Sequence, residues 1–143
     1  MKLKEIMSNS VVRINLQESV AVAARTLARH NIGALPVCDT DGKLCGVVTD
    51  RDLVTRCIAA GRNPEATKVR DVMSSNVISA RPDLDIVAAA QLMGRQQIRR
   101  LPVVENGRLC GMVSLGDLAN REETTYEAAD ALTEISSNVS VRE

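Results

Sequence analysis

Hydrophobic residues recur with the same spacing in two stretches of the chain, and each stretch predicts one amphipathic helix. In both, apolar residues fall at positions i, i+3, i+4 and i+7, which form one face of an α-helix. These positions are Val20, Ala23, Ala24 and Leu27 in the first stretch, and Ile86, Ala89, Ala90 and Met93 in the second. Two helices with equivalent apolar faces are therefore expected, 66 residues apart.

Short apolar runs flank both helices and predict strands. One run precedes each helix, at 11–14 and 77–80, and two follow it, at 34–38 with 44–48 and at 100–104 with 109–113. Turn-forming residues separate each later pair, 39–42 in one copy and 105–107 in the other. A further helix begins after each hairpin, and the first of these is expected to end at Gly61. Each stretch is thus a β-α-β-β-α unit, which indicates an α+β fold.

The two stretches are an internal repeat. A shift of 66 residues aligns identical pairs that include Met7/Met73, Ala24/Ala90, Arg29/Arg95, Leu35/Leu101 and Pro36/Pro102. After a one-residue deletion, a shift of 65 aligns Cys45/Cys110, Gly46/Gly111, Val48/Val113, Asp52/Asp117 and Leu53/Leu118. A period present only twice favours two units that close on each other, because an open solenoid needs at least three. We predict two pseudo-twofold-related repeats in one compact module.

This organisation sets the expected boundaries. The first repeat covers 1–61, a link covers 62–68 and the second repeat covers 69–120, followed by a C-terminal helix and frayed tail at 121–143. In that last segment Ala128, Ala131, Leu132 and Ile135 form a helical stripe. The stripe is consistent with a helix lying on its own module or with a contact to a partner. From Ser136 on, the chain is expected to fray.

Composition argues against several classes of function. Lys plus Arg and Asp plus Glu each number 18, so no excess charge attracts nucleic acid or anionic lipid. Tyr126 is the only aromatic residue, so the stacking platforms typical of single-strand binders are missing. With His30 as the single histidine and no Cys-x-x-Cys, we assign no catalytic or metal-ligating residue. The sequence favours a protein that is not an enzyme, with nucleic acid an unlikely partner.

The cysteines and the hydropathy favour the cytoplasm. Cys38, Cys45, Cys57 and Cys110 lie within apolar runs, which predicts buried, reduced thiols. We expect no signal peptide, and no apolar run approaches the ~20 residues that cross a bilayer. We expect a cytoplasmic protein without a membrane partner.

The most specific motif stands where a strand meets the next helix. A strand ends on a hydroxyl residue, Thr49 or Ser114, and Asp52 or Asp117 follows three positions later. One interpretation is a capping box, which stabilises a helix by roughly 0.5–2 kcal/mol. In the other, the helix N-terminus and hydroxyl bind a phosphate while the carboxylate binds ribose hydroxyls. Both interpretations use the same atoms.

The order of elements, with Leu-Pro-Val before the hairpin and Gly-x-x-Thr/Ser-x-x-Asp after it, resembles the CBS domain, named for cystathionine beta-synthase. Residues 3–118 resemble a tandem pair of such domains, often called a Bateman module. The resemblance implies two clefts between the repeats that bind an adenosine-type ligand: AMP, ADP, ATP or S-adenosylmethionine. It implies no cofactor, and Mg²⁺ only if ATP carries it.

The resemblance also implies which residues bind. In the preferred cleft Ser114 and Asp117 would hold phosphate and ribose, and Arg99 or Arg100 would form charge-assisted hydrogen bonds to phosphate. The remaining residues of that cleft would be Ser8, Val11, Val12, Gly33 and Ala34. In the second cleft Thr49 and Asp52 would hold the phosphate and the ribose in the same way. Its other residues would be Ser74, Val77, Ile78, Ile98 and Arg99.

The copies differ beside the motif. Asp50 adds negative charge near any phosphate of the second cleft, which suits a less charged ligand or none. Gly116, in place of Arg51, leaves room for close approach in the preferred cleft. The alternative for Arg99 and Arg100 is a solvated pair at the start of a strand.

Two functions follow from these features. The first is a non-catalytic regulatory module that binds an adenosine-type ligand and signals through rearrangement of a homodimer or of a separate protein partner. The alternative is a ligand-free oligomerisation or interaction scaffold with degenerate clefts, in which the motif only caps helices.

Overall fold

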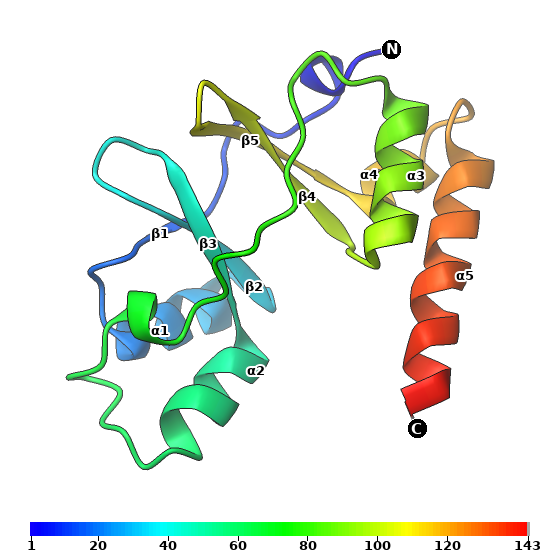
Figure 1. The fold of residues 1–143 in the computed structure, drawn as a ribbon. Coiled ribbons are helices and arrows are strands. Elements are labelled where there is room, and N and C mark those ends of the chain that lie inside the picture. The colour runs from blue at the N-terminus through cyan, green and yellow to red at the C-terminus, as the bar shows by residue number, and fades with distance from the viewer. Residues whose placement is uncertain (143) are drawn as a thin grey trace. The chain divides into compact units, whose positions relative to one another are not determined.

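The computed structural model describes the backbone of residues 1–142 and the side chains of residues 1–137. The strands are β1 (Ile14–Asn15), β2 (Ala34–Cys38), β3 (Leu44–Thr49), β4 (Arg100–Glu105) and β5 (Arg108–Ser114) (Figure 1). The α-helices are α1 (Val20–His30), α2 (Asp50–Leu53), α3 (Ile86–Gln96), α4 (Leu115–Ala119) and α5 (Thr125–Arg142). A π-helical turn, η2 (Val54–Ile58), continues α2, and 3₁₀ turns lie at η1 (Leu3–Glu5) and η3 (Val69–Asp71).

These elements confirm the predicted α+β class with two repeated β-α-β-β-α units. The helices and hairpin strands lie where the hydrophobic pattern places them, and Gly61 has the positive φ (72°) expected of a helix end. The prediction was wrong about the length of the first strand in each copy. Instead of 11–14 and 77–80, the ladder holds only β1 in the first copy and a single bridge, Ala80 with Val103, in the second.

The shortened strands coincide with the places where the chain passes between two compact units. Val12–Val77 and Gly107–Leu109 form one unit, called the α1 unit below. Met1–Val11, Ile78–Asn106 and Cys110–Glu143 form the other, called the α3 unit. Residues 11–13 and 77–79 lie where the chain passes from one unit to the other, and they make no strand pairing. Only the last residue of each predicted strand is therefore paired. The repeat boundaries at 61, 68 and 120 describe the sequence copies and stay a prediction.

The α1 unit packs α1 and α2 against a three-stranded sheet in the order β1-β2-β3. β1 runs parallel to β2, and β2 runs antiparallel to β3. Helix α1 begins where the Ser19 hydroxyl accepts a hydrogen bond from Val22 N–H, and it ends at Asn31 in the left-handed conformation. The buried core of the α1 unit consists of Ile14, Val20, Ala23, Leu27, Leu35, Val37, Val48, Leu53, Cys57, Val69 and Val72.

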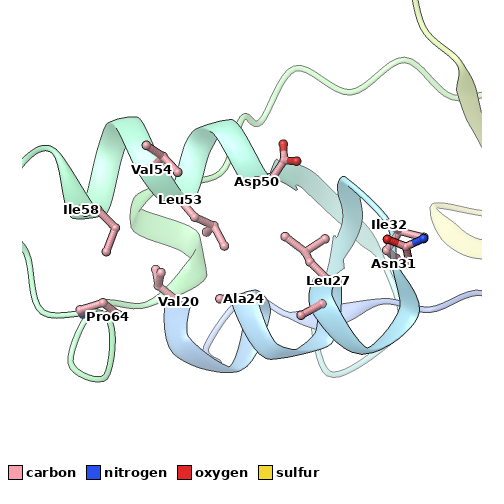
Figure 2. Close-up of a pocket in the computed structure, with 11 residues that line it drawn as sticks. Val20, Ala24, Leu27, Asn31, Ile32, Asp50, Leu53, Val54, Ile58 and Pro64 are labelled. Atoms are coloured by element: carbon pink, nitrogen blue, oxygen red, sulfur yellow. The ribbon is translucent and has the colours of Figure 1, made fainter.

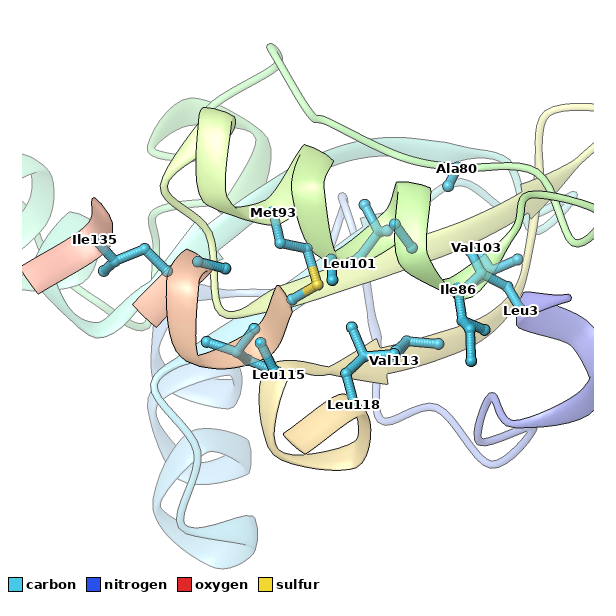
Figure 3. Close-up of a cluster of buried hydrophobic side chains, with 14 residues drawn as sticks. Leu3, Ala80, Ile86, Met93, Leu101, Val103, Val113, Leu115, Leu118 and Ile135 are labelled. Atoms are coloured by element: carbon cyan, nitrogen blue, oxygen red, sulfur yellow. The ribbon is translucent and has the colours of Figure 1, made fainter. Parts of the chain in front are cut away.

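The α3 unit repeats this plan and adds α5. β4 and β5 form a two-stranded sheet, and Asn106 and Gly107 turn the chain between them with φ of 52° and 79°. The core gathers side chains from α3, β4, β5 and α4 (Figure 3). Its largest fully buried members are Leu3, Ile86, Met93, Leu101, Val103 and Leu118.

Helix α5 lies on its own unit, against α3 and α4. Ala128, Ala131 and Ile135 of the predicted stripe are buried, whereas Leu132 is 41% exposed. A side chain at Gly94 on α3 would meet the Ala131 Cα at 3.0 Å, so the two helices approach closely. The contact confirms the first of the two interpretations of the stripe. The predicted fraying concerns residues whose side chains lie largely outside the described part and stays a prediction.

All four cysteines are free, but their burial differs from the expectation. Cys38 and Cys57 are buried as predicted, whereas Cys45 and Cys110 are half-buried. On β3 the reason is strand alternation: Gly46 and Val48 are buried, so Cys45 falls on the opposite face. On β5, Cys110 packs against the core of the α3 unit but is only partly covered. Among the described residues, no helix is both long enough and apolar enough to span a membrane.

The buried Cys38 thiol predicts a loss of stability at alkaline pH. Burial raises its pKa above the ordinary 9.0, and a hydrogen bond with Arg13 offsets part of this effect. A raised folded-state pKa stabilises the fold below the unfolded-state pKa, and the stabilisation disappears as the pH rises through the folded value. We expect the free energy of unfolding to fall above about pH 9, and to fall less steeply in Cys38→Ala. Denaturant titrations from pH 7 to 10.5 measure this, and equal slopes for both proteins would contradict it.

Candidate functional site

The strand that leads into each motif contains a glycine that is pressed against a neighbouring segment. A Cβ on Gly46 would lie 2.6 Å from the Ser74 carbonyl oxygen and 2.9 Å from the Met73 sulfur. A Cβ on Gly111 would clash with the Met7 sulfur. Each strand also hydrogen-bonds the neighbouring serine backbone in both directions, Val47 with Ser74 at 2.9 Å and Met112 with Ser8 at 3.0 Å. Ser74 and Ser8 thus pair with the strand residues that stand two positions before Thr49 and Ser114.

Both Thr/Ser-x-x-Asp motifs form complete capping boxes. Asp52 N–H donates to Thr49 Oγ1 at 3.1 Å, and Thr49 N–H donates to Asp52 Oδ2 at 3.0 Å. In the second copy Asp117 N–H donates to Ser114 Oγ at 3.1 Å, and Ser114 N–H donates to Asp117 Oδ2 at 2.9 Å. The capping interpretation is therefore confirmed for both copies. In each aspartate the capping box uses one carboxylate oxygen, so the second oxygen can accept hydrogen bonds from another group.

The second oxygen of Asp52 is already engaged. Asp52 is buried, and its Oδ1 lies 3.8 Å from Arg56 Nη2. Arg56 Nη1 also donates to the carbonyl oxygens of Val72 at 3.0 Å and Met73 at 3.3 Å. Arg56 thus ties the motif to the segment ahead of Ser74. The sequence prediction missed this residue, although its i, i+4 spacing from Asp52 is a signal that could have identified it.

The second oxygen of Asp117 is open. Asp117 is exposed, and the described part of the chain offers it no ion pair. The residue that aligns with Arg56 is Arg121, which instead reaches the Met1 sulfur at 3.4 Å. Of the two motif carboxylates, the one at Asp117 can accept hydrogen bonds from a ligand without breaking an existing ion pair.

Arg99 and Arg100 lie next to the Asp117 motif. Leu115 N–H donates to the Arg99 carbonyl oxygen at 2.8 Å, which holds the start of β4 against the first residue of α4. Both arginines are exposed, and no acidic partner for either is found among the described residues. With Ser114 and Gly116 they line an open cavity of about 580 Å³ that α5 closes on one side, while Asp117 is not part of this lining.

In the α1 unit, Gly33 and Ala34 stand at the positions of Arg99 and Arg100, and an acidic side chain lies beside Gly33. Asp50 N–H donates to the Gly33 carbonyl oxygen at 2.9 Å, the counterpart of the Leu115–Arg99 bond. The Asp50 carboxylate lies beside Gly33, 3.4 Å from where a Cβ would stand. Asp50 thus disfavours an anion beside Gly33, whereas Arg99 and Arg100 favour one beside Ser114.

The predicted residues divide between the two compact units. The α3 unit holds Ser8, Val11, Ile78, Ile98, Arg99, Arg100, Ser114 and Asp117. The α1 unit holds Val12, Gly33, Ala34, Thr49, Asp52, Ser74 and Val77. Ile78 and Ile98 pack against the core of the α3 unit, and Val12 packs against that of the α1 unit, so these three also serve folding. Each predicted cleft draws on both units, and its full set of walls stays a prediction.

Among the described residues, no group of three or more His, Cys, Asp and Glu side chains gathers in a way that could hold a metal ion.

The repeated motif and its geometry agree with a match to the CBS domain family at residues 3–58 and again at 69–124. The chain belongs to the CBS domain family and carries a tandem pair of the domains.

Relatives of known sequence or structure support this assignment. The CBS domain-containing protein YhcV of Bacillus subtilis (strain 168) is 40% identical over 134 residues, which is 94% of each chain. A crystal structure of Hypoxic Response Protein I with two coordinated zinc ions is 31% identical, with a TM-score of 0.77 over 85% of this chain and 98% of that one. The CBS domain pair of protein MJ0100, in complex with 5′-methylthioadenosine and S-adenosyl-L-methionine, is 30% identical, with a TM-score of 0.70 over 83% and 93%.

Proposed function

We propose that this protein is a non-catalytic regulatory module that binds an adenosine-type ligand at the Asp117 motif. The observation that carries the proposal is the open carboxylate of Asp117 in a motif whose Ser114 lines a cavity together with two arginines, neither of which has an acidic partner among the described residues. Membership of the CBS family supports it, because the related MJ0100 pair binds two adenosine compounds. Asp117 would accept hydrogen bonds from the ribose hydroxyls, and Ser114 would contact the phosphate.

The charge of the site favours a ligand with phosphate groups. Two guanidinium groups near Ser114 can form charge-assisted, bidentate hydrogen bonds with phosphate oxygens. AMP, ADP and ATP therefore suit the Asp117 site better than S-adenosylmethionine, which carries no phosphate. The Asp52 site, with its ion pair to Arg56 and the nearby Asp50, suits a less charged adenosine compound or none.

Regulation requires that the ligand favours one of two states, since binding energy acts only through differential affinity. We propose a cytoplasmic homodimer whose arrangement, or whose contact with a regulated protein, changes when the ligand binds. Light scattering with and without ligand tests the assembly.

The experiment that tests the proposal is thermal unfolding against AMP, ADP, ATP, S-adenosylmethionine and NADH, each with and without Mg²⁺. A ligand at ~100 times its dissociation constant stabilises the protein by about 2.7 kcal/mol. For a chain of this size the midpoint should rise by roughly 5–10 °C. We expect a selective rise with a phosphate-bearing nucleotide and a smaller one in Arg99→Ala/Arg100→Ala.

The alternative function makes the opposite prediction. Both motifs already cap helices, which favours the scaffold in which the clefts are degenerate. If none of the five compounds shifts the midpoint, the scaffold replaces the ligand-binding module.

A further inference from the structure

The guanidinium group of Arg56 lies between two residues of the predicted second cleft. Its Nη2 is 3.8 Å from Asp52 Oδ1, and its Nη1 donates to Ser74 Oγ at 3.4 Å. The same Nη1 donates to the carbonyl oxygens of Val72 and Met73, which hold the side chain in place. One side chain thus engages two of the groups with which a ligand was predicted to make contact.

Arg56 reaches Asp52 because the helix after the first motif is long. Figure 2 shows α2 and η2 as one continuous helix beside α1, and Arg56 stands on it four residues beyond Asp52. Residues with this spacing lie on the same face of a helix. Leu53 and Cys57 pack in the core of the α1 unit and fix the orientation of the helix. All residues of the contact belong to the α1 unit, so the ion pair depends on that unit alone.

The second copy has the equivalent arginine but not the contact. With the shift of 65, Arg121 aligns with Arg56, and it also follows its motif aspartate by four residues. Helix α4 ends at Ala119, so Arg121 lies beyond the helix and donates to the Met1 sulfur at 3.4 Å instead. The two copies share the same Asp-x-x-x-Arg spacing, and the length of the helix decides which carboxylate is paired.

We propose that Arg56 is a specificity-determining residue that closes the Asp52 motif to ribose, so that Asp117 provides the one nucleoside site. This inference rests on the proposed function, in which a motif carboxylate accepts hydrogen bonds from ribose hydroxyls. A ribose at Asp52 has to replace a guanidinium group with neutral hydroxyls, at a carboxylate that is only 13% exposed. Because interactions with a charged partner are the stronger ones, this exchange is unfavourable. No such exchange is needed at Asp117, whose carboxylate has no ion pair in the described structure.

Equilibrium dialysis with tritiated adenosine tests the proposal by counting the equivalents bound per chain. Adenosine carries no phosphate, so the carboxylate of Asp50 does not repel it. Arg56→Met keeps an aliphatic side chain and removes the charge, and it should bind one equivalent more than the parent. The added equivalent should disappear in Arg56→Met/Asp52→Asn.

Two further variants separate the charge of Arg56 from a structural effect. Arg56→Lys keeps a cation near Asp52 and should bind no more adenosine than the parent, although it loses the geometry of the guanidinium group. Arg121→Met removes the equivalent arginine of the second copy, which does not contact its motif, and serves as the matched control. It should gain no site.

The role of Arg56 and the proposed function can fail separately. A parent that already binds two equivalents, or an Arg56→Met variant that gains none, overturns the role of Arg56. A parent that shows no thermal shift with any nucleotide overturns the proposed function, whereas an adenosine site gained in Arg56→Met still supports the role of Arg56. Circular dichroism checks that Arg56→Met is folded. If it is not, Arg56→Gln carries the same expectation, because its neutral amide can still donate to the carbonyl oxygens of residues 72 and 73.

Discussion

Replacing Gly46 with alanine is expected to lower the free energy of unfolding by about 3 kcal/mol. The new Cβ would stand 2.6 Å from the Ser74 carbonyl oxygen, closer than real Cβ contacts come. That carbonyl accepts the Val47 N–H at 2.9 Å, so it cannot retreat without lengthening the bond that holds the two segments together. Thermal denaturation should show a midpoint about 10 °C lower.

The chain supplies a matched control for this substitution. At Gly116 a Cβ would find its nearest neighbour, Ser114 Oγ, at 3.7 Å, which is ordinary van der Waals contact. Gly116→Ala also gains helix propensity, so its free energy of unfolding should stay the same or rise by up to about 1 kcal/mol. Equal midpoints for Gly46→Ala and Gly116→Ala would contradict the close approach at β3.

The second large effect is expected at Asp52. Asp52→Ala removes the acceptor for Thr49 N–H and leaves Arg56 without its carboxylate. A lost cap and an unsatisfied, partly buried donor together cost about 2–3 kcal/mol. Asp117→Ala loses the same cap, but its carboxylate is exposed and unpaired in the described structure, so the expected cost is about 1 kcal/mol.

Urea titration of the two variants side by side measures this difference. The midpoint of Asp52→Ala should fall clearly below that of Asp117→Ala, with unchanged m-values. If the two variants lose equal stability, Asp52 and Asp117 serve the fold equally, and the structural reason for preferring the Asp117 site disappears.

Periodicity predicted the parts of this fold that depend on local pattern. The 3.6-residue repeat placed α1 and α3 because each buries one stripe, and the turn residues placed the hairpins because Asn106 and Gly107 adopt positive φ readily. The capping boxes could also be predicted from the sequence, because all their atoms belong to four consecutive residues.

The features that the sequence did not reveal depend on contacts between distant segments. The runs at 11–14 and 77–80 are apolar like strands, but the chain leaves the ladder there to enter the other compact unit. Cys45 lies in an apolar run, yet the alternation of β3 turns it away from the buried face. Arg56 acts through the carbonyl oxygens of residues 72 and 73, which no spacing rule connects to it.

Isothermal titration of the nucleotide that gives the largest thermal shift, against the parent, Asp117→Asn and Asp52→Asn, tests the central claim most directly. The asparagine amide oxygen can still accept the capping hydrogen bond, so each change removes mainly the charge. Because hydrogen bonds to a charged group contribute about 1.5–3 kcal/mol, Asp117→Asn should weaken binding about tenfold or more while Asp52→Asn leaves it within about twofold. Binding that Asp117→Asn leaves intact, or that Asp52→Asn abolishes instead, would contradict the assignment of the ligand to the Asp117 motif.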